Sequence, residues 1–250
     1  MKGEEKKALS HFFNTAADYL STGYTQNTVD YAFSDDEEIS AENTFSTLPL
    51  AYQLDEDDNV TDDDSLAEIY GDIKKCSLCA LSSSRINTVP GEGAENPLVM
   101  VIGEGPGADE DSTGRPFVGK AGQLLDKMLS SIGLYRDKNC YIANTVKCRP
   151  PSNREPDADE MSACANYLDR QIKLLKPLLI LCAGKTAAKR LLNSGESLTR
   201  LRLRFYEYLN VPVLVTYHPS ALLREESYKR PAWEDLKMLK AKLISLNGNI

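Results

Sequence analysis

The sequence lacks any long run of apolar residues. No stretch reaches the roughly 18 consecutive apolar residues that a membrane-spanning helix needs, and no apolar signal-peptide core follows the first residues, MKGEEKK. Internal repeats are also absent, which excludes a solenoid or other repeat architecture. We therefore expect a cytoplasmic protein with no membrane partner.

Positive charge is scarce in the N-terminal part. Residues 1–75 carry 5 Lys and Arg against 18 Asp and Glu, whereas the remainder is mildly basic and the whole chain has a net charge of −8. We expect residues 1–64 to be an acidic, largely disordered arm, with a short helix possible over 4–21. Residues 65–250 form the predicted folded domain, whose positive charge suits either a polyanionic partner or ordinary solubility.

Within the predicted domain, apolar runs alternate with helical patterns. The runs at 98–102, 141–145, 178–182 and 213–217 read as buried strands. Helical patterns cover about 66–75, after a capping box at Ser65, and about 121–132, 157–175, 185–192 and 233–246. This alternation predicts an α/β fold, a three-layer α/β/α sandwich with a central four-stranded parallel sheet.

Four of the six cysteines have a spacing that suits metal binding. Cys76 and Cys79 form a CxxC motif, Cys148 follows a predicted strand, and Cys164 lies in the next predicted helix. Without an export signal, disulfides are not expected. The four thiols suit an iron–sulfur cluster or zinc, and the CxxC alone also fits a redox dithiol. Cys140 and Cys182 fall within apolar strands and are expected in the core.

Two glycine-rich segments resemble nucleotide-binding motifs. Residues 103–108 fit G-x-G-x-x-G/A, but Pro106 lacks a backbone N–H, about a dozen non-helical residues are expected before the next helix, and the second strand ends without an acidic residue. Residues 114–120 resemble a P-loop that follows no strand and has Ala121 where Ser or Thr is needed. We expect no nucleotide cofactor.

Motifs follow the predicted strands in the loops where open α/β sheets bind ligands. They are GEGPG at 103–107, NTVKCRPP at 144–151, CAG at 182–184 and HPSALLR at 218–224, with GRPFVG at 114–119. All of these except CAG together resemble family 4 uracil-DNA glycosylases, the iron–sulfur enzymes of the uracil-DNA glycosylase superfamily, over about residues 70–245. Gly105 stands where that family usually has Ala. A related subclass that captures uracil covalently carries an inserted basic loop with a reactive His. This chain has only His11 and His218 and no such loop, so we do not expect that activity.

The resemblance implies a glycosylase that flips uracil out of DNA and hydrolyses its N-glycosidic bond. Phe117 would stack on the base, Asn144 would read the uracil edge, and His218 would donate to O2 of the leaving base. Glu104 would line the pocket near the attacking water, and the backbones of Gly103 and Gly105 would approach the base closely.

The resemblance also implies the DNA contacts and the cofactor. Uracil-containing DNA, single- or double-stranded, is the expected partner of a monomeric enzyme. Ser220, Leu222, Leu223 and Arg224 would contact the DNA, one leucine as a wedge and Arg224 at a phosphate. Lys120, Lys147 and Arg149 are further phosphate candidates. Cys76, Cys79, Cys148 and Cys164 would hold a [4Fe–4S] cluster with a structural role.

Two alternatives stay open at this point. One is an iron–sulfur module that binds nucleic acid or senses redox state without glycosylase activity. The other is a zinc protein of unrelated function, because cysteine spacing alone does not separate zinc from iron–sulfur.

Overall fold

The computed structural model describes residues 64–247. The predicted acidic arm and its short helix lie outside the described residues. No helix within the described part of the chain is long and apolar enough to cross a membrane.

A six-stranded sheet forms the centre of the molecule, in the order β1-β3-β2-β4-β6-β5. Its strands are β1 (Glu92–Gly93), β2 (Val99–Gly103), β3 (Cys140–Asn144), β4 (Leu179–Ala183), β5 (Phe205–Tyr208) and β6 (Val211–Thr216). The four inner strands are parallel, as predicted. The two edge strands are antiparallel to their neighbours and were not predicted. β1 has two residues and β5 is half-exposed, so neither gives an apolar run.

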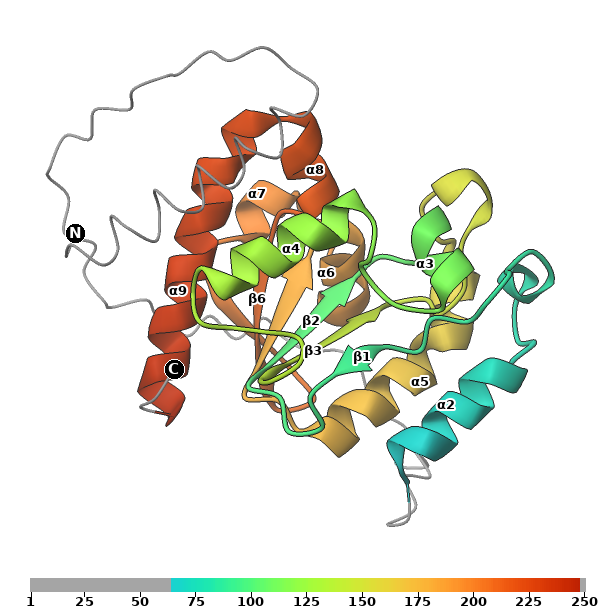
Figure 1. Cartoon of the computed structure of the whole chain (residues 1–250). Coiled ribbons are helices and arrows are strands. Elements are labelled where there is room, and N and C mark those ends of the chain that lie inside the picture. Colours follow the sequence, from blue (N-terminus) through green and yellow to red (C-terminus); the bar gives the residue numbers. More distant parts are fainter. Residues whose placement is uncertain (1–63, 248–250) are drawn as a thin grey trace, which may run out of the picture.

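Helices cover both faces of the sheet (Figure 1). They are α2 (Leu66–Lys75), α3 (Ala108–Thr113), α4 (Lys120–Ser130), α5 (Ala158–Leu175), α6 (Lys185–Leu192), α7 (Leu198–Leu201), α8 (Pro219–Arg224) and α9 (Lys229–Asn247). Alternate residues of each inner strand point to opposite faces. Val99 and Val101 pack in one cluster with α4, α8 and α9, and Met100 and Ile102 pack in a second with α5 and α6. The predicted three-layer sandwich is confirmed.

The described part of the chain begins at Asp64, next to the predicted start of the domain. Ser65 caps α2 through the predicted capping box with Glu68. Asp64 precedes that cap and accepts two hydrogen bonds from the Arg170 guanidinium of α5, at 2.7 and 2.5 Å. This ion pair joins Asp64 to α5.

The prediction that a long non-helical segment follows Gly107 is wrong. α3 begins at Ala108, with Gly107 as its N-cap, and the Glu110 carboxylate accepts from the Gly107 N–H at 3.1 Å. The missing helix start therefore no longer counts against a dinucleotide site. Two features still do: Pro106 has no N–H to offer a phosphate, and β3 ends in Asn144 rather than in an acidic residue.

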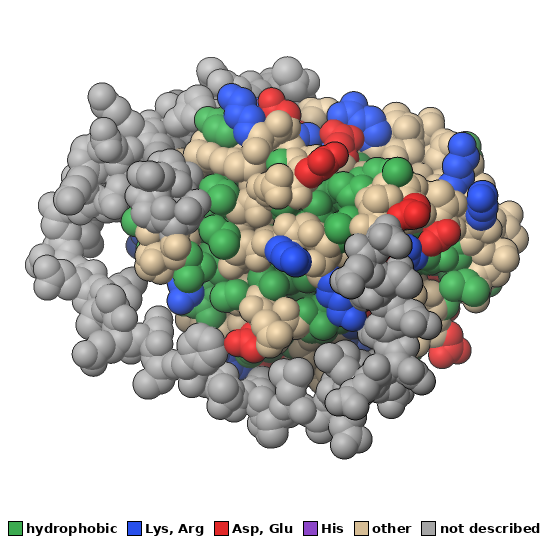
Figure 2. All heavy atoms as spheres, turned by 90° about the horizontal axis from the view of Figure 1, so that it is seen from below, with side chains coloured by type: hydrophobic (Ala, Val, Ile, Leu, Met, Phe, Trp, Pro, Cys, Tyr) green, Lys and Arg blue, Asp and Glu red, His purple; other side chains and the backbone are tan. Residues whose placement is uncertain are grey.

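The four parallel strands end at one edge of the sheet. Gly103, Asn144, Ala183 and Thr216 are the last residues of β2, β3, β4 and β6. In Figure 1 this is the upper edge, beside α3 and α8. Figure 2 shows the molecule from below, where basic and acidic side chains are scattered among apolar ones without a concentration of either sign.

Candidate active site

Asn144 and Phe117 meet over Gly103. Gly103 and Asn144 are paired residues of the neighbouring strands β2 and β3. A Cβ atom at Gly103 would lie 2.5 Å from both Asn144 Oδ1 and Phe117 Cζ. Real side chains do not tolerate such distances, so only glycine leaves room for the amide and the ring together.

His218 joins this pair from the end of β6. The ring centroids of Phe117 and His218 are 5.6 Å apart, with an angle of 35° between the planes. Phe117 therefore lies next to two other predicted site residues, Asn144 and His218, which come from separate loops. Gly184, which directly follows β4, has a φ of +107°, and a Cβ atom there would lie 3.0 Å from His218 Cβ.

The side-chain carbonyl of Asn144 is buried without a partner. Asn144 is 2% exposed, and its Oδ1 has no hydrogen bond. Leaving a buried acceptor unpaired costs about 1–3 kcal/mol, so such groups call for a functional explanation. The atom is suited to accept a hydrogen bond from a bound ligand.

The backbone around Asn144 is fixed to the first loop. The N–H groups of Thr145 and Val146 donate to the carbonyls of Gly103 and Glu104, at 3.0 and 3.3 Å. The Thr145 hydroxyl also donates to the Glu104 carbonyl. The two loops therefore form one rigid edge of the site.

The Nδ1 atom of His218 is occupied by a hydrogen bond from its own loop. The Ser220 N–H donates to His218 Nδ1 at 3.2 Å, so Nδ1 is an acceptor and the ring proton sits on Nε2. Burial, with a smaller contribution from Arg224, lowers the pKa of His218 to about 4. The imidazole is therefore uncharged at neutral pH and offers the Nε2–H group.

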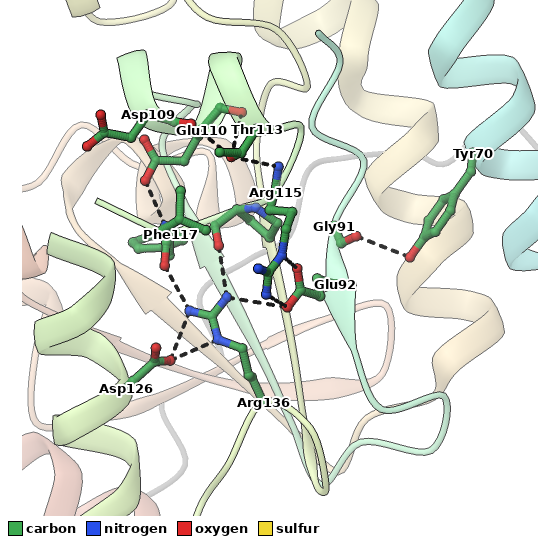
Figure 3. A network of polar contacts seen from close by, with 12 residues as sticks. Tyr70, Gly91, Glu92, Asp109, Glu110, Thr113, Arg115, Phe117, Asp126 and Arg136 are labelled. Atoms are coloured by element: carbon green, nitrogen blue, oxygen red, sulfur yellow. Dashed lines mark hydrogen bonds and ion pairs between the residues drawn. The ribbon is translucent and has the colours of Figure 1, made fainter. Parts of the chain in front are cut away.

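The turn that carries Phe117 has a strained backbone. Phe117 has a φ of +52°, which is uncommon for a side chain with a Cβ. Arg136 donates to the carbonyls of Pro116 and Phe117 at 3.0 and 2.8 Å (Figure 3). Gly122 lies against the same turn, and only glycine fits there, since a Cβ atom would be 1.8 Å from the Phe117 carbonyl oxygen.

Glu110 holds the other side of the same turn. One carboxylate oxygen accepts from the N–H groups of Val118 and Gly119, at 2.9 and 3.0 Å. Its second oxygen accepts from Gly107, so one side chain connects the first loop to the Phe117 turn. Glu110 and Arg136 were not predicted, because neither lies in a pattern that sets it apart from a surface charge.

Carboxylates fix the Arg136 guanidinium in place. Arg136 donates to Asp126 at 2.9 Å and lies 3.7 Å from Glu92. Glu92 is held in turn by two hydrogen bonds of 2.7 Å from Arg115 (Figure 3). The hydrogen bond from Arg115 is the main reason that the pKa of Glu92 is lowered.

Glu104 is half-buried rather than a surface carboxylate. Its Oε2 accepts a hydrogen bond from the Thr186 hydroxyl of α6. Burial raises the pKa of Glu104, the Thr186 hydrogen bond opposes this, and the charge of Glu155 adds to the rise. Thr186 was not predicted from the sequence, although it follows the strand-end glycine Gly184 by two residues.

The α8 segment corrects one predicted DNA contact. Leu222 is fully buried in the core cluster shared with α4 and α9, so it is not free to enter a DNA stack. Leu223 is only partly buried and Ser220 is half-buried, whereas Arg224 is exposed. If a leucine acts as a wedge, the helix leaves Leu223 for that role.

Lys147 is also not a phosphate contact. The side chain is 1% exposed, and burial lowers its pKa to about 8. Its ammonium donates to the Asn144 carbonyl at 3.0 Å and to Gln171 Oε1 at 2.7 Å. The other phosphate candidates are more accessible, since Lys120 is exposed and Arg149 is half-buried.

The four predicted metal-binding cysteines lie around one pocket. Cys76, Cys79, Cys148 and Cys164 all line it, together with Arg85, Lys147 and Tyr167. All six cysteines are free thiols, and Cys140 and Cys182 are buried in the sheet, as predicted. Within residues 64–247, no three His, Cys, Asp or Glu side chains are arranged to hold a metal ion as they stand.

The surroundings of the thiols suit a negatively charged, sulfur-ligated group. Arg85 Nη1 donates to Cys148 Sγ at 3.2 Å, and the Lys147 N–H donates to Cys164 Sγ at 3.3 Å. Hydrogen bonds to ligand sulfurs are typical of iron–sulfur sites. Lys147 also lines this pocket, and its ammonium donates to two neutral oxygens, those of Asn144 and Gln171. The donor set therefore fits an anionic thiolate-bound cluster.

Comparisons with known proteins agree with this geometry. Residues 90–237 match the family model described as the uracil DNA glycosylase superfamily. A type-4 uracil-DNA glycosylase of Sulfurisphaera tokodaii is 42% identical over 191 residues, covering 73% of this chain and 86% of the relative. One of Thermotoga maritima is 41% identical over 183 residues, covering 71% and 95%. One of Archaeoglobus fulgidus is 39% identical and covers 70% and 92%.

Proposed function

The chain belongs to the type-4 uracil-DNA glycosylases of the uracil-DNA glycosylase superfamily, and on this basis we propose how its residues act. It is a DNA repair enzyme that hydrolyses the N-glycosidic bond between uracil and deoxyribose. One observation is the main support for the roles assigned below. Asn144 Oδ1 is buried without a partner, next to the Phe117 ring, which in turn lies beside His218.

Base recognition uses the Asn144 amide and the Phe117 ring. The enzyme reaches the sugar C1′ by flipping the nucleotide out of the stack, at a cost of a few kcal/mol. Asn144 Oδ1 accepts from uracil N3–H, and the amide nitrogen donates to O4. Cytosine reverses both groups, and each buried mismatch costs about 1–3 kcal/mol. Stacking on Phe117 contributes roughly 1–3 kcal/mol.

Bond cleavage leaves negative charge on uracil O2. His218 donates to that oxygen through Nε2–H, while Ser220 fixes the ring by donating to Nδ1. A donor aimed at a developing oxyanion stabilises the transition state by about 2.7–4 kcal/mol. Because the donor is neutral, it transfers no proton to the base, and uracil leaves as an anion.

Glu104 orients the water that attacks C1′. Thr186 occupies one carboxylate oxygen and leaves the other for the water. Burial raises the pKa of Glu104, which moves it towards the range of a general base. Its negative charge also stabilises the cationic sugar of the transition state.

Cys76, Cys79, Cys148 and Cys164 hold a [4Fe–4S] cluster whose role is structural. It joins the segment after α2, the loop after β3 and helix α5, which supply the four thiols. Arg85 and the Lys147 N–H stabilise the ligand sulfurs.

The DNA runs along the edge that carries α8. Arg224 contacts a phosphate, Leu223 fills the gap left by the flipped base, and Ser220 contacts the backbone. The enzyme acts as a monomer on single- or double-stranded DNA. Removal of residues 1–64 should leave the activity intact or raise it at low salt, and a large loss of folded protein would contradict that statement.

The test is an excision assay on oligonucleotides that carry one uracil, one cytosine or one thymine. Alkali should cleave the strand at uracil alone, and free uracil should appear in equal amount. Asn144→Ala and His218→Ala should abolish most of the cleavage while retaining iron. Binding of the oligonucleotides without uracil release by iron-replete protein would refute the proposal.

A further inference from the structure

Lys147 connects the uracil-reading residue to the thiol pocket. Its side-chain ammonium donates to the backbone carbonyl of Asn144, and its backbone N–H donates to Cys164 Sγ. Cys148, another residue that lines the pocket, is its neighbour in the chain. A single residue thus contacts both Asn144 and the cysteine site.

Helix α5 provides both anchors for this connection. Cys164 and Gln171 are seven residues apart, so they lie on one face of the helix, two turns from each other. Gln171 Oε1 accepts from Lys147 Nζ at 2.7 Å. Lys147 is therefore held to α5 at two points, one through its backbone and one through its ammonium.

The Gln171 amide is itself fixed by buried partners. Its Nε2 donates to the Pro90 carbonyl at 2.9 Å and to the Tyr141 hydroxyl at 3.1 Å. The Tyr141 hydroxyl lies 2.6 Å from that of Tyr70 on α2. Gln171 and Tyr141 are fully buried, so this network gives Lys147 a rigid support.

We propose that Lys147 is a positioning residue, which fixes the Asn144 peptide against α5 and so makes uracil recognition depend on the packing of the cysteine site. This inference rests on the proposed function, because it assigns Asn144 to the base. Removal of the ammonium leaves the backbone bond to Cys164 in place but frees the Asn144 carbonyl. The Asn144 side chain would then be held less firmly, while the thiol pocket would stay intact.

The experiment is a double-mutant cycle on binding. The ligand is an oligonucleotide with 2′-fluoro-2′-deoxyuridine, which resists hydrolysis, and the readout is Kd from fluorescence anisotropy. Lys147→Met should raise Kd about tenfold or more, as expected when a hydrogen bond from a charged group is lost. In an Asn144→Ala background the same change should raise Kd less than about twofold. In a His218→Gln background, Lys147→Met should still raise Kd about tenfold or more.

Iron content and a second lysine complete the design. Iron per protein should be unchanged in Lys147→Met, and Lys189→Met, an exposed lysine of α6, should bind like the parent. Gln171→Met should reproduce the non-additivity if Lys147→Met does not fold. Equal effects in the Asn144 and His218 backgrounds, loss of iron, or failure of both variants to fold would overturn the proposal. If Asn144→Ala itself binds normally, the proposed function fails instead.

Discussion

The imidazole of His218 faces the phenyl ring of Phe117, with their centroids 5.6 Å apart. The two residues come from loops about a hundred positions apart in the sequence. The Asn144 amide lies on the other side of the Phe117 ring contact, next to Gly103, where a Cβ atom would be 2.5 Å from both Asn144 Oδ1 and Phe117 Cζ. These three side chains are the ones to which we assign base stacking, recognition of the uracil edge and donation to O2.

The protonation state of His218 gives the first prediction. Its pKa of about 4 lies below the ordinary 6.5, so the imidazole should stay neutral down to about pH 5. NMR should show ring signals, absent from His218→Gln, that shift only below that pH. Between pH 6.5 and 4 the unfolded chain takes up a proton that the folded chain does not, so His218 makes the free energy of unfolding fall on acidification. A midpoint near 6.5 would contradict the lowered pKa and the neutral state assigned to the ring between pH 5 and 6.5.

Gly103→Ala should remove uracil binding. The new methyl group would lie 2.5 Å from Asn144 Oδ1 and from Phe117 Cζ, so one of the two side chains must move. We expect at least a tenfold loss in kcat/KM, since each displaced contact contributes about 1–3 kcal/mol. Gly71→Ala makes the same chemical change where no atom lies within 4 Å, and should leave activity unchanged. Equal activity of the two variants would show that the pocket has been misplaced.

Arg136→Met should weaken the enzyme by releasing the Phe117 turn. Two buried carbonyls lose their donor, and Phe117 is no longer held at positive φ. The expected costs are about 1–3 kcal/mol of stability and a fall in kcat/KM of about tenfold. Arg115→Met is the matched control, because Arg115 is 59% exposed and pairs with Glu92 at the surface. That variant should unfold at nearly the same temperature as the parent, because exposed ion pairs contribute little to stability.

Cys164→Ala should lose its iron and the absorbance near 400 nm that a [4Fe–4S] cluster gives. The thiol lines the four-cysteine pocket and accepts a hydrogen bond from Lys147. Cys140→Ala removes a thiol of similar burial that lies in β3 among the core residues. It should keep a full complement of iron. Iron loss in both variants, or in neither, would refute the assignment of the four ligands.

Much of the fold could be predicted because its signals are local. The inner strands are fully buried, so each gives an unbroken apolar run, and α2 begins at the predicted capping box. Because parallel strands of one sheet end at the same edge, the predicted strand ends alone place Gly103, Asn144 and His218 together there. α3 escaped prediction because its sequence, ADEDST, has no apolar periodicity, and its start depends on Glu110 reaching back to Gly107.

The supporting residues depend on contacts that no local pattern records. Thr186 is recognisable only when Glu104 lies beside it, and Arg136 only when the turn between α4 and β3 approaches the Pro116 carbonyl. Leu222 and Leu223 differ by one position, and helix orientation alone decides which is buried. Lys147 looked like a surface cation, since nothing in the sequence shows that Gln171 lies within its reach.

The most direct measurement is a crystal structure with free uracil bound. We predict that Asn144 Oδ1 accepts a hydrogen bond from N3–H, that the base lies on the Phe117 ring, and that His218 Nε2 is within hydrogen-bond distance of O2. A uracil bound elsewhere, or one in this pocket that leaves Asn144 Oδ1 without a partner, would contradict this prediction.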